Sequence, residues 1–273
     1  MRLLIHRNHY EASLWSAHYI SDRINGYFKT SEEPFVLGLP TGSSPLMIYS
    51  ELIKLNKEKK LSFANVHTFN MDEYIGLPAD HSQSYRYFMT ENFFKHIDIN
   101  TANTHIPNGM AEDPVKECLL YEEAIEKSGG IELFLGGMGS DGHIAFNTPG
   151  SSLGSRTRVK TLNDETRVAN SRFFNGDPSQ VPATAITVGV KTIMDAREVM
   201  IIVSGKNKAR ALKAVIEEGV SHNWTLSCLQ MHPKAIIVCD EDACDELSMK
   251  TVRYFTSIEK ESMKIFFERA NIQ

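Results

Sequence analysis

Short apolar runs alternate with segments of helical periodicity along this chain, and that alternation is the strongest constraint on its fold. Strands are predicted at residues 3–5, 34–39, 66–70, 131–135, 183–190, 198–203 and 235–239. Helices are predicted at residues 10–28, 45–54, 84–94, 121–127, 206–218 and 247–267, with Gly219 ending the fifth. Because strands that are regularly separated by helices favour a parallel sheet, we expect an α/β fold. It should be a mostly parallel, open, Rossmann-like sheet with helices on both faces, in one domain spanning residues 1–273.

Charge and cysteine usage narrow the class of protein. The net charge is −5, and no basic stripe is interleaved with aromatic residues, which argues against a nucleic-acid partner. No apolar run reaches the length of a membrane span, and the first residues become polar too soon for a signal peptide. The four cysteines lack metal-binding spacing, so we expect a reduced, cytoplasmic protein with no membrane partner.

One loop concentrates the residues that suggest chemistry. It runs from Gly136 to Asn147 directly after a predicted strand, and its glycines allow tight turns and close approach to a ligand. Asp141 and His143 are two residues apart, a spacing that puts both side chains on one side of an extended segment. A carboxylate beside an imidazole is a common arrangement for general acid–base catalysis.

The same loop contains the spacing G-x-G-x-x-G from Gly137 to Gly142, which resembles a dinucleotide fingerprint. That motif should open a helix and be followed about 20 residues later by an acidic residue. Here Pro149 and Gly150 interrupt any long helix, and basic residues occupy the expected acidic position. We therefore regard the match as accidental and predict no dinucleotide cofactor.

A second loop after a strand offers Thr41, Gly42, Ser43 and Ser44 at a strand-to-helix junction. Backbone N–H groups and hydroxyls at such a junction suit an anion such as phosphate. Ser43 or Ser44 could equally serve only as a helix cap. The loop lacks the Gly-Lys-Ser/Thr ending of a nucleoside-triphosphate site with Mg²⁺.

Two further loops complete the set. Asp72 follows the strand at 66–70 and could face a pocket, although a solvated acidic turn with Glu73 is the alternative. Lys208 lies in a cationic loop at a helix start and could bind phosphate together with Arg172, unless these are solvated surface charges. Because ligands bind beyond the carboxyl ends of parallel strands, the loops together predict proton transfer on a small phosphorylated metabolite. We find no metal-ligand spacing and predict no metal.

The stretch 151–182 has few apolar runs and many polar residues. It is either a lid over the site or an ordinary ordered excursion, and composition favours neither.

Several motifs resemble the isomerising glucosamine-6-phosphate deaminases. The matching stretches are LGLPTG (37–42), TFNMDEY (68–74), DGHIAFN (141–147), residues 151–161, ANSRFF (169–174) and LQMHPKA (229–235). The resemblance covers essentially the whole chain. It implies an enzyme of amino-sugar catabolism that converts D-glucosamine 6-phosphate and water to D-fructose 6-phosphate and ammonia, without metal or organic cofactor.

The resemblance also implies roles for individual residues. Asp72 would move a proton between C2 and C1, and His143, held by Asp141, would assist opening of the pyranose ring. The implied substrate-binding residues are Thr41, Gly42, Ser43, Ser44, Gly137, Arg172 and Lys208, with the two cations on the 6-phosphate.

Some family members are hexamers that N-acetylglucosamine 6-phosphate activates from a site between subunits. The matching positions are Met1, Ser151, Ser152, Arg158, Lys160 and Tyr254. The resemblance therefore implies a homohexamer with an allosteric site. By itself the pair Arg158 and Lys160 is as typical of a solvated strand face.

Position 148 departs from the family pattern. The family has a glutamate there, which belongs to the acid–base group around the histidine, whereas this chain has Thr148. Loss of one supporting acid–base group could cost about 10²-fold in rate. The chain is then an engineered variant or a natural member with retuned activity. Two alternatives stay open, namely a sugar-phosphate sensor without turnover and a related sugar-phosphate isomerase or lactonase.

Overall fold

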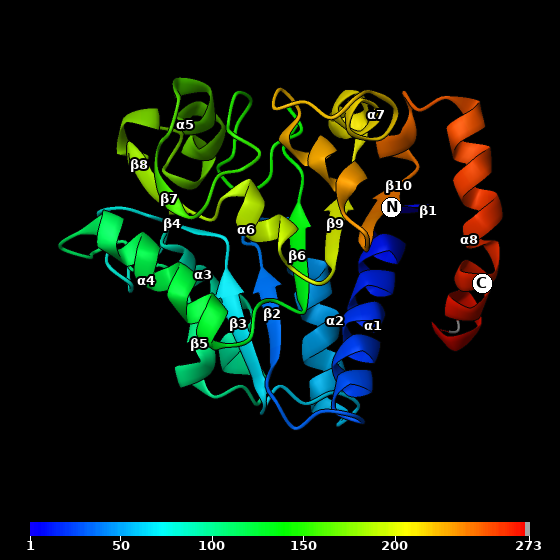
Figure 1. Cartoon of the computed structure of the whole chain (residues 1–273), viewed down its shortest axis with the longest axis horizontal. Helices are drawn as coiled ribbons and strands as arrows, with labels where there is room; N and C mark the ends of the chain where they lie inside the picture. Colours follow the sequence, from blue (N-terminus) through cyan, green and yellow to red (C-terminus); the bar gives the residue numbers. More distant parts are fainter. Residues whose placement is uncertain (271–273) are drawn as a thin grey trace.

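The chain forms a seven-stranded parallel sheet, as the alternation of strands and helices predicts (Figure 1). The computed structural model describes residues 1–270. The strand order is β1-β10-β9-β6-β2-β3-β5, and each adjacent pair is parallel. The bounds are β1 Arg2–His6, β2 Phe35–Leu39, β3 Val66–Asn70, β5 Thr104–His105, β6 Leu133–Gly137, β9 Val199–Val203 and β10 Ala235–Asp240. The predicted fold class is confirmed.

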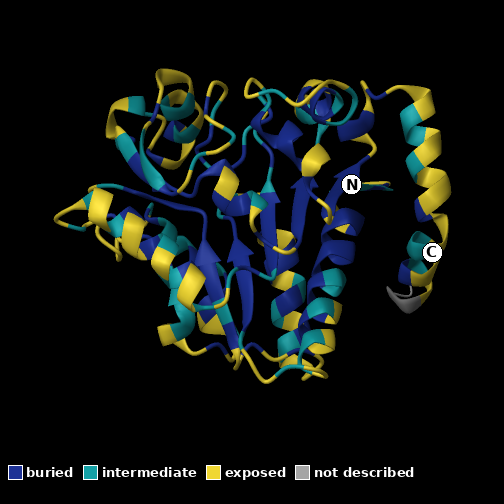
Figure 2. Cartoon of the chain, in the orientation of Figure 1, coloured by how far each residue is buried: buried dark blue, intermediate teal, exposed yellow. Residues whose placement is uncertain are grey.

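Helices cover both faces of this sheet, because its strands are apolar on both faces (Figure 2). In β2, Leu37 joins the apolar cluster that contains Ile20 of α1, whereas Val36 joins the cluster that contains Leu212 of α7. Successive strand residues therefore feed opposite cores. The helices are α1 His9–Tyr27, α2 Leu46–Lys57, α3 Tyr85–Asn92, α4 Pro114–Lys127, α5 Asp164–Asn170, α6 Val190–Met194, α7 Ala209–Glu217 and α8 Met249–Ala270.

A second, antiparallel sheet was not predicted. It has the order β4-β8-β7, with β4 Asp72–Tyr74, β8 Thr184–Thr187 and β7 Arg158–Thr161. The chain passes from β3 into β4 with only Met71 between them, so the two sheets meet at the end of β3. Polar β7, with the sequence RVKT, and three-residue β4 carry too little apolar alternation to be read as strands.

Element ends differ from the predictions for local reasons. Helix α4 begins seven residues earlier than the apolar pattern indicates, because Asp113 caps it and Pro114 occupies its first turn. Helix α7 ends at Glu217, and Glu218 is already extended, so the helix stops one residue earlier than predicted and Gly219 does not end it. Short 3₁₀ helices span Phe94–His96, Thr101–Asn103, Ser171–Phe173, Pro178–Gln180, Lys206–Lys208, Thr225–Met231 and Asp242–Cys244.

Candidate active site

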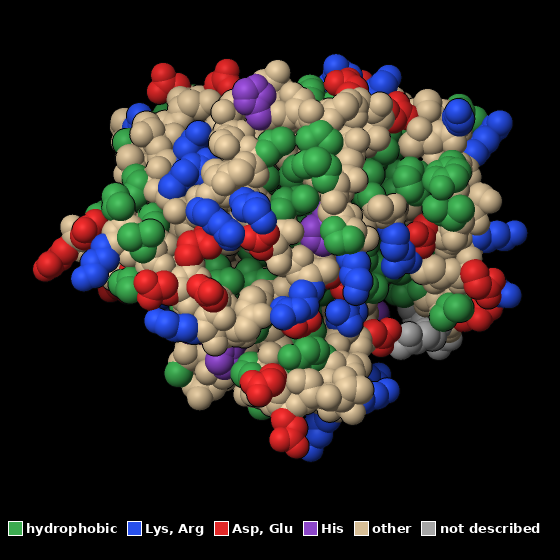
Figure 3. All heavy atoms as spheres, in the orientation of Figure 1, with side chains coloured by type: hydrophobic (Ala, Val, Ile, Leu, Met, Phe, Trp, Pro, Cys, Tyr) green, Lys and Arg blue, Asp and Glu red, His purple; other side chains and the backbone are tan. Residues whose placement is uncertain are grey.

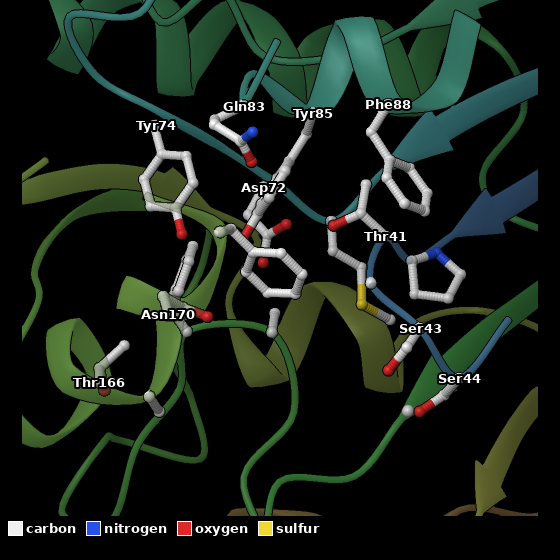
Figure 4. Close-up of a pocket in the computed structure, with 18 of the residues that line it drawn as sticks. Thr41, Ser43, Ser44, Asp72, Tyr74, Gln83, Tyr85, Phe88, Thr166 and Asn170 are labelled. Atoms are coloured by element: carbon white, nitrogen blue, oxygen red, sulfur yellow. The ribbon is translucent and has the colours of Figure 1, made fainter. Parts of the chain in front are cut away.

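A cavity of about 300 Å³ lies beyond the carboxyl ends of β2, β3 and β6 (Figure 4). It is also bounded by β4 of the small sheet and by residues around α5, so it lies where the two sheets meet. This is where an open parallel sheet is expected to bind a ligand. Of the residues that the sequence singles out, the cavity is lined by Thr41, Gly42, Ser43, Ser44, Asp72, Gly137, His143 and Arg172.

The loop between β2 and α2 presents hydroxyls and backbone to the cavity. Gly42 has φ +92°, a left-handed conformation that favours glycine. Pro45 occupies the helix N-cap position, and no side chain caps the helix. The alternative that Ser43 or Ser44 serves only as a cap is therefore wrong. Both serines point from this loop toward the cavity in Figure 4, which suits a phosphate group.

Asp72 is the buried carboxyl of the site. It is 7% exposed at the first position of β4, and it lies near the middle of the cavity in Figure 4. Burial raises the pKa of Asp72 to about 8, and the charge of Glu73 beside it contributes. A carboxyl that titrates near neutral pH can both accept and donate a proton during turnover. The alternative of a solvated acidic turn is wrong, since Glu73 is also buried.

Asp141 and His143 form a hydrogen-bonded pair, with 2.5 Å between Oδ1 and Nδ1. The prediction that they meet is confirmed, but a tight turn brings them together rather than an extended segment. Gly142 N–H donates to the Gly139 carbonyl in that turn, with φ +73° at Gly142. A Cβ at Gly139 would lie 2.3 Å from His143 Nδ1, so the pair requires glycine there. The carboxylate orients the imidazole ring, as general acid–base chemistry needs.

The charged groups at and around this pair, Asp141 and Lys208, are partly buried. Burial alone would raise the pKa of Asp141, but the hydrogen bond and charge of His143 outweigh it, and the pKa falls below its usual value. Burial lowers the pKa of Lys208, opposed by the negative charge of Asp141 and reinforced by Arg172. Lys208 does not line the cavity, but it interacts electrostatically with Asp141 and Arg172. Arg172 lines the cavity, and its guanidinium lies over the Phe173 ring, 4.6 Å from the ring centroid.

A buried carboxylate that sequence reasoning missed supports the Lys208 loop. Asp240, at the end of β10, accepts hydrogen bonds from Ser204 Oγ at 2.5 Å and Gly205 N–H at 3.0 Å. It also accepts one from Ala243 N–H at 2.9 Å. The signal was available, because Asp240 follows an apolar strand just as Asp72 does.

An aromatic wall was also missed as part of the site. Tyr74, Tyr85, Phe146 and Phe174 all line the cavity. Tyr74 lies 4.9 Å from Tyr85 and 5.8 Å from Phe146, measured between ring centroids. The sequence analysis assigned the aromatic residues of 84–94 to helix packing alone. Such rings exclude water from the reacting groups.

Thr148 is half-buried and does not line the cavity. Its N–H donates to the Phe146 carbonyl, and its own carbonyl accepts from Ser151 N–H, both at 3.0 Å. Thr148 therefore lies in a turn directly after the loop of residues 136–147.

The six candidate effector residues fall into two groups. Lys160 Nζ lies 3.3 Å from Ser151 Oγ, and Arg158 donates to Asn147 Oδ1 at 2.9 Å; Ser152 is the exposed neighbour of Ser151. Met1 precedes β1, and Tyr254 lies on α8, next to β1. Figure 1 shows β7 and α8 at opposite sides of the molecule. One chain therefore does not bring the six together.

Several kinds of site are absent from residues 1–270. No three His, Cys, Asp or Glu side chains in that range are arranged to hold a metal ion. No helix follows Gly142 before β7, so the G-x-G-x-x-G spacing is not a dinucleotide fingerprint. Among the helices of this range, none is long and apolar enough to cross a bilayer.

Known proteins resemble this chain along most of its length. Residues 11–239 match the family of glucosamine-6-phosphate isomerases/6-phosphogluconolactonase. A glucosamine-6-phosphate deaminase of Aeromonas hydrophila is 59% identical over 259 residues, which cover 95% of this chain and 97% of that protein. One from Phocaeicola vulgatus is 57% identical over 263 residues, covering 96% and 100%.

Solved structures agree with this similarity. A monomeric glucosamine-6-phosphate deaminase is 38% identical in sequence and superposes with a TM-score of 0.85. The match covers 90% of this chain and 100% of the other. A 6-phosphogluconolactonase of Trypanosoma cruzi, 22% identical with a TM-score of 0.71 over 90% and 97% of the two chains, shares the fold.

Proposed function

The chain belongs to the family of glucosamine-6-phosphate isomerases and 6-phosphogluconolactonases, and we propose that it is a glucosamine-6-phosphate deaminase. It converts D-glucosamine 6-phosphate and water to D-fructose 6-phosphate and ammonia in amino-sugar metabolism. One observation carries the proposal: the buried carboxyl of Asp72 and the imidazole of His143 line the same cavity as the phosphate-type loop of Ser43 and Ser44. The deaminases with 57–59% identity support the same activity.

The substrate binds through its phosphate at one end of the cavity. The hydroxyls of Thr41, Ser43 and Ser44 and the backbone around Gly42 and Gly137 receive it. Arg172 and Lys208 neutralise the charge, the guanidinium by paired hydrogen bonds and the ammonium as a point charge. Because both cations already act on each other, a dianion between them relieves their repulsion.

Proton transfers then carry out the reaction. His143, oriented by Asp141, moves a proton from the C1 hydroxyl to the ring oxygen and opens the pyranose. Asp72 removes the C2 proton of the open aldose to give an enolamine and delivers a proton to C1. The resulting C2 imine adds water and releases ammonia, leaving the ketose. Proton transfers drive the ring opening and the C2-to-C1 shift, and water replaces ammonia at C2, so the chemistry needs no metal or organic cofactor.

Incubation with glucosamine 6-phosphate, followed by assay of ammonia and fructose 6-phosphate, tests the proposal. Equal release of both products is expected, and Asp72→Asn should abolish it. Glu126→Gln, which removes an exposed carboxylate on α4, is the matched control and should retain full activity. Ketose without ammonia would identify an isomerase, hydrolysis of 6-phosphogluconolactone a lactonase, and tight binding without turnover a sensor.

Thr148 is proposed to reduce the rate rather than abolish it. It lacks the carboxylate that the family pattern puts there, while Asp72, Asp141 and His143 remain in place. Restoring the carboxylate with Thr148→Glu should raise kcat by about 10²-fold. An unchanged rate would show that the turn at position 148 has no part in the acid–base group.

We propose that the chain forms a homohexamer with an allosteric site for N-acetylglucosamine 6-phosphate. The separation of Ser151, Arg158 and Lys160 from Met1 and Tyr254 supports a site completed by a second subunit. Exposed apolar residues on α8 offer contact area, and Figure 3 shows hydrophobic side chains at the surface there. The similar solved deaminase is described as monomeric, so sedimentation equilibrium with and without the effector is the test.

The lid and the location are also proposals. Arg172 belongs to the stretch 151–182 and lines the cavity, which supports closure of this segment over a bound sugar phosphate.

All four cysteines are free, which supports a reducing compartment such as the cytoplasm.

A further inference from the structure

Glu73 is a second buried carboxylate next to Asp72, and it does not line the cavity. Its Oε1 accepts hydrogen bonds from the N–H groups of Tyr74 and Tyr85, each at 2.9 Å. Its Oε2 accepts one from Arg86 N–H, also at 2.9 Å. The carboxylate thus joins β4, which carries Asp72, to the first turn of α3.

The first turn of α3 is a wall of the cavity. Gln83, Ser84 and Tyr85 line it, and Figure 4 shows Tyr85 and Gln83 beside Asp72. Tyr85 stacks on Phe146 with 6.3 Å between ring centroids. The bonds that Glu73 makes therefore fix the distance between the carboxyl of Asp72 and the wall against which a sugar would lie.

Glu73 affects Asp72 through its negative charge as well as through its hydrogen bonds. The titratable and charged groups around Asp72 are Glu73 and Tyr74 from β4, Tyr85 from α3, Tyr121 from α4, and His143 and Arg172 of the cavity lining. Glu73 is the carboxylate in this set. Burial is the larger cause of the raised pKa of Asp72, and the negative charge of Glu73 raises that pKa further. Burial raises the pKa of Glu73 itself, but three N–H donors and the charge of Arg86 oppose that rise.

We propose that Glu73 is a positioning residue for the proton transfer at Asp72, holding the α3 wall against β4 and placing a negative charge beside the neighbouring carboxyl. The proposal rests on the proposed function, because it concerns the proton that Asp72 transfers. Glu73 touches neither substrate nor reacting atoms; it acts through Asp72 and through the wall.

Two substitutions separate the two effects. Glu73→Gln keeps the shape and the two Oε1 contacts, but it removes the charge and the acceptor of Arg86 N–H. The acidic limb of kcat/KM should then move to lower pH by roughly half a unit to one unit, because Asp72 ionises more readily without a like charge. Glu73→Asp keeps the charge but does not reach α3. The acidic limb of kcat/KM for Glu73→Asp should stay at its native pH. Its kcat should fall about tenfold, because the α3 wall is then misplaced.

Ser84→Ala is the matched control. It removes the hydrogen bond from Tyr87 N–H that caps α3, without changing any charge near Asp72. The acidic limb of Ser84→Ala should coincide with that of the wild type, whatever happens to its rate. An equal limb shift in Ser84→Ala and Glu73→Gln would overturn the proposal, because loosening of α3 would then explain both.

A second readout does not depend on turnover. The ionisation of Asp72 can be followed as the difference in unfolding free energy between each protein and its Asp72→Asn version, measured against pH. This difference should stop growing at a lower pH with Glu73→Gln than with native Glu73. Coinciding curves would overturn the proposal even if the enzyme releases ammonia, whereas a shifted curve without ammonia release would contradict the proposed function alone.

Discussion

Among single residues, Gly139 carries the sharpest steric constraint in the site. An added Cβ would lie 2.3 Å from His143 Nδ1 and 2.7 Å from Asp141 Oδ1. Gly139→Ala must therefore separate the imidazole from its carboxylate, and kcat should fall by about 10²-fold. Steady-state kinetics check this, with Gly154→Ala as control, since its Cβ would meet no atom closer than 3.7 Å. A Gly139→Ala enzyme with native kcat would show that ring opening does not use this pair.

Asp72 should make the protein less stable as the pH rises. Its pKa is 3.8 in the unfolded chain and about 8 in the fold. Below about pH 4 it is protonated in both states and has no effect. Between about pH 4 and pH 8 the unfolded chain gains stability by ionising while the fold does not. Asp72→Asn removes this loss and should stabilise the protein by at least about 2 kcal/mol at pH 8, with the gain vanishing near pH 4.

Denaturant unfolding at several pH values measures that gain. Asp98→Asn is a control of opposite sign. Burial would raise the pKa of Asp98, but hydrogen bonds from Ser62, Phe63 and Asn56 lower it overall, so its carboxylate stabilises the fold above its unfolded pKa. Asp98→Asn should therefore lose stability at neutral pH. A gain for Asp72→Asn that does not depend on pH would contradict the ionisation argument.

Among the elements, the strands of the large sheet were predictable and those of the small sheet were not. Residues 199–203 and 235–239 are apolar on both faces, which marks a strand buried under helices. The small sheet lies at the edge of the core, and half-buried Arg158 and Lys160 on β7 give no such signal. The loops of the site were found because glycines, hydroxyls and charges follow apolar strands. The position of Asp240 after an apolar strand was visible in the sequence, but the roles of Glu73 and Asp240 depend on donors from distant segments, which the sequence does not show.

The loop before α7 depends on β10 for its position. Asp240→Ala leaves Ser204 Oγ and Gly205 N–H without their acceptor, which should let the loop that carries Lys208 move. The KM for glucosamine 6-phosphate should rise about tenfold while kcat changes little, since the lost contact concerns binding of the phosphate. Asp245→Ala is the control, because it removes only the exposed ion pair with Lys206 at 3.0 Å. A lower kcat with native KM would place Asp240 in the chemistry instead.

At the scale of the whole molecule, the cavity lies between two parts that are formed by different stretches of the sequence, namely the large sheet and the segment 151–182 around the small sheet. Loops of the large sheet supply Ser43 and Ser44 to the cavity, while Arg172 comes from the segment packed around the small sheet (Figure 1). If the segment 151–182 closes over the cavity as proposed, a phosphate that contacts both parts is bound more tightly in the closed state. Binding must therefore shift that segment toward the closed state by the same free energy.

Limited trypsin digestion measures that shift. Cleavage after Arg167, on α5, should slow about tenfold or more with saturating fructose 6-phosphate, because a closed segment opens less often to the protease. Cleavage after Lys59, between α2 and β3, should keep its rate and serves as the internal control. With Arg172→Ala the protection at Arg167 should disappear even at ligand concentrations that restore occupancy, since the link between the two parts is gone. Full protection in that variant would mean that the sugar phosphate closes the segment through other contacts, and an unchanged cleavage rate in the native protein would mean that the segment does not move.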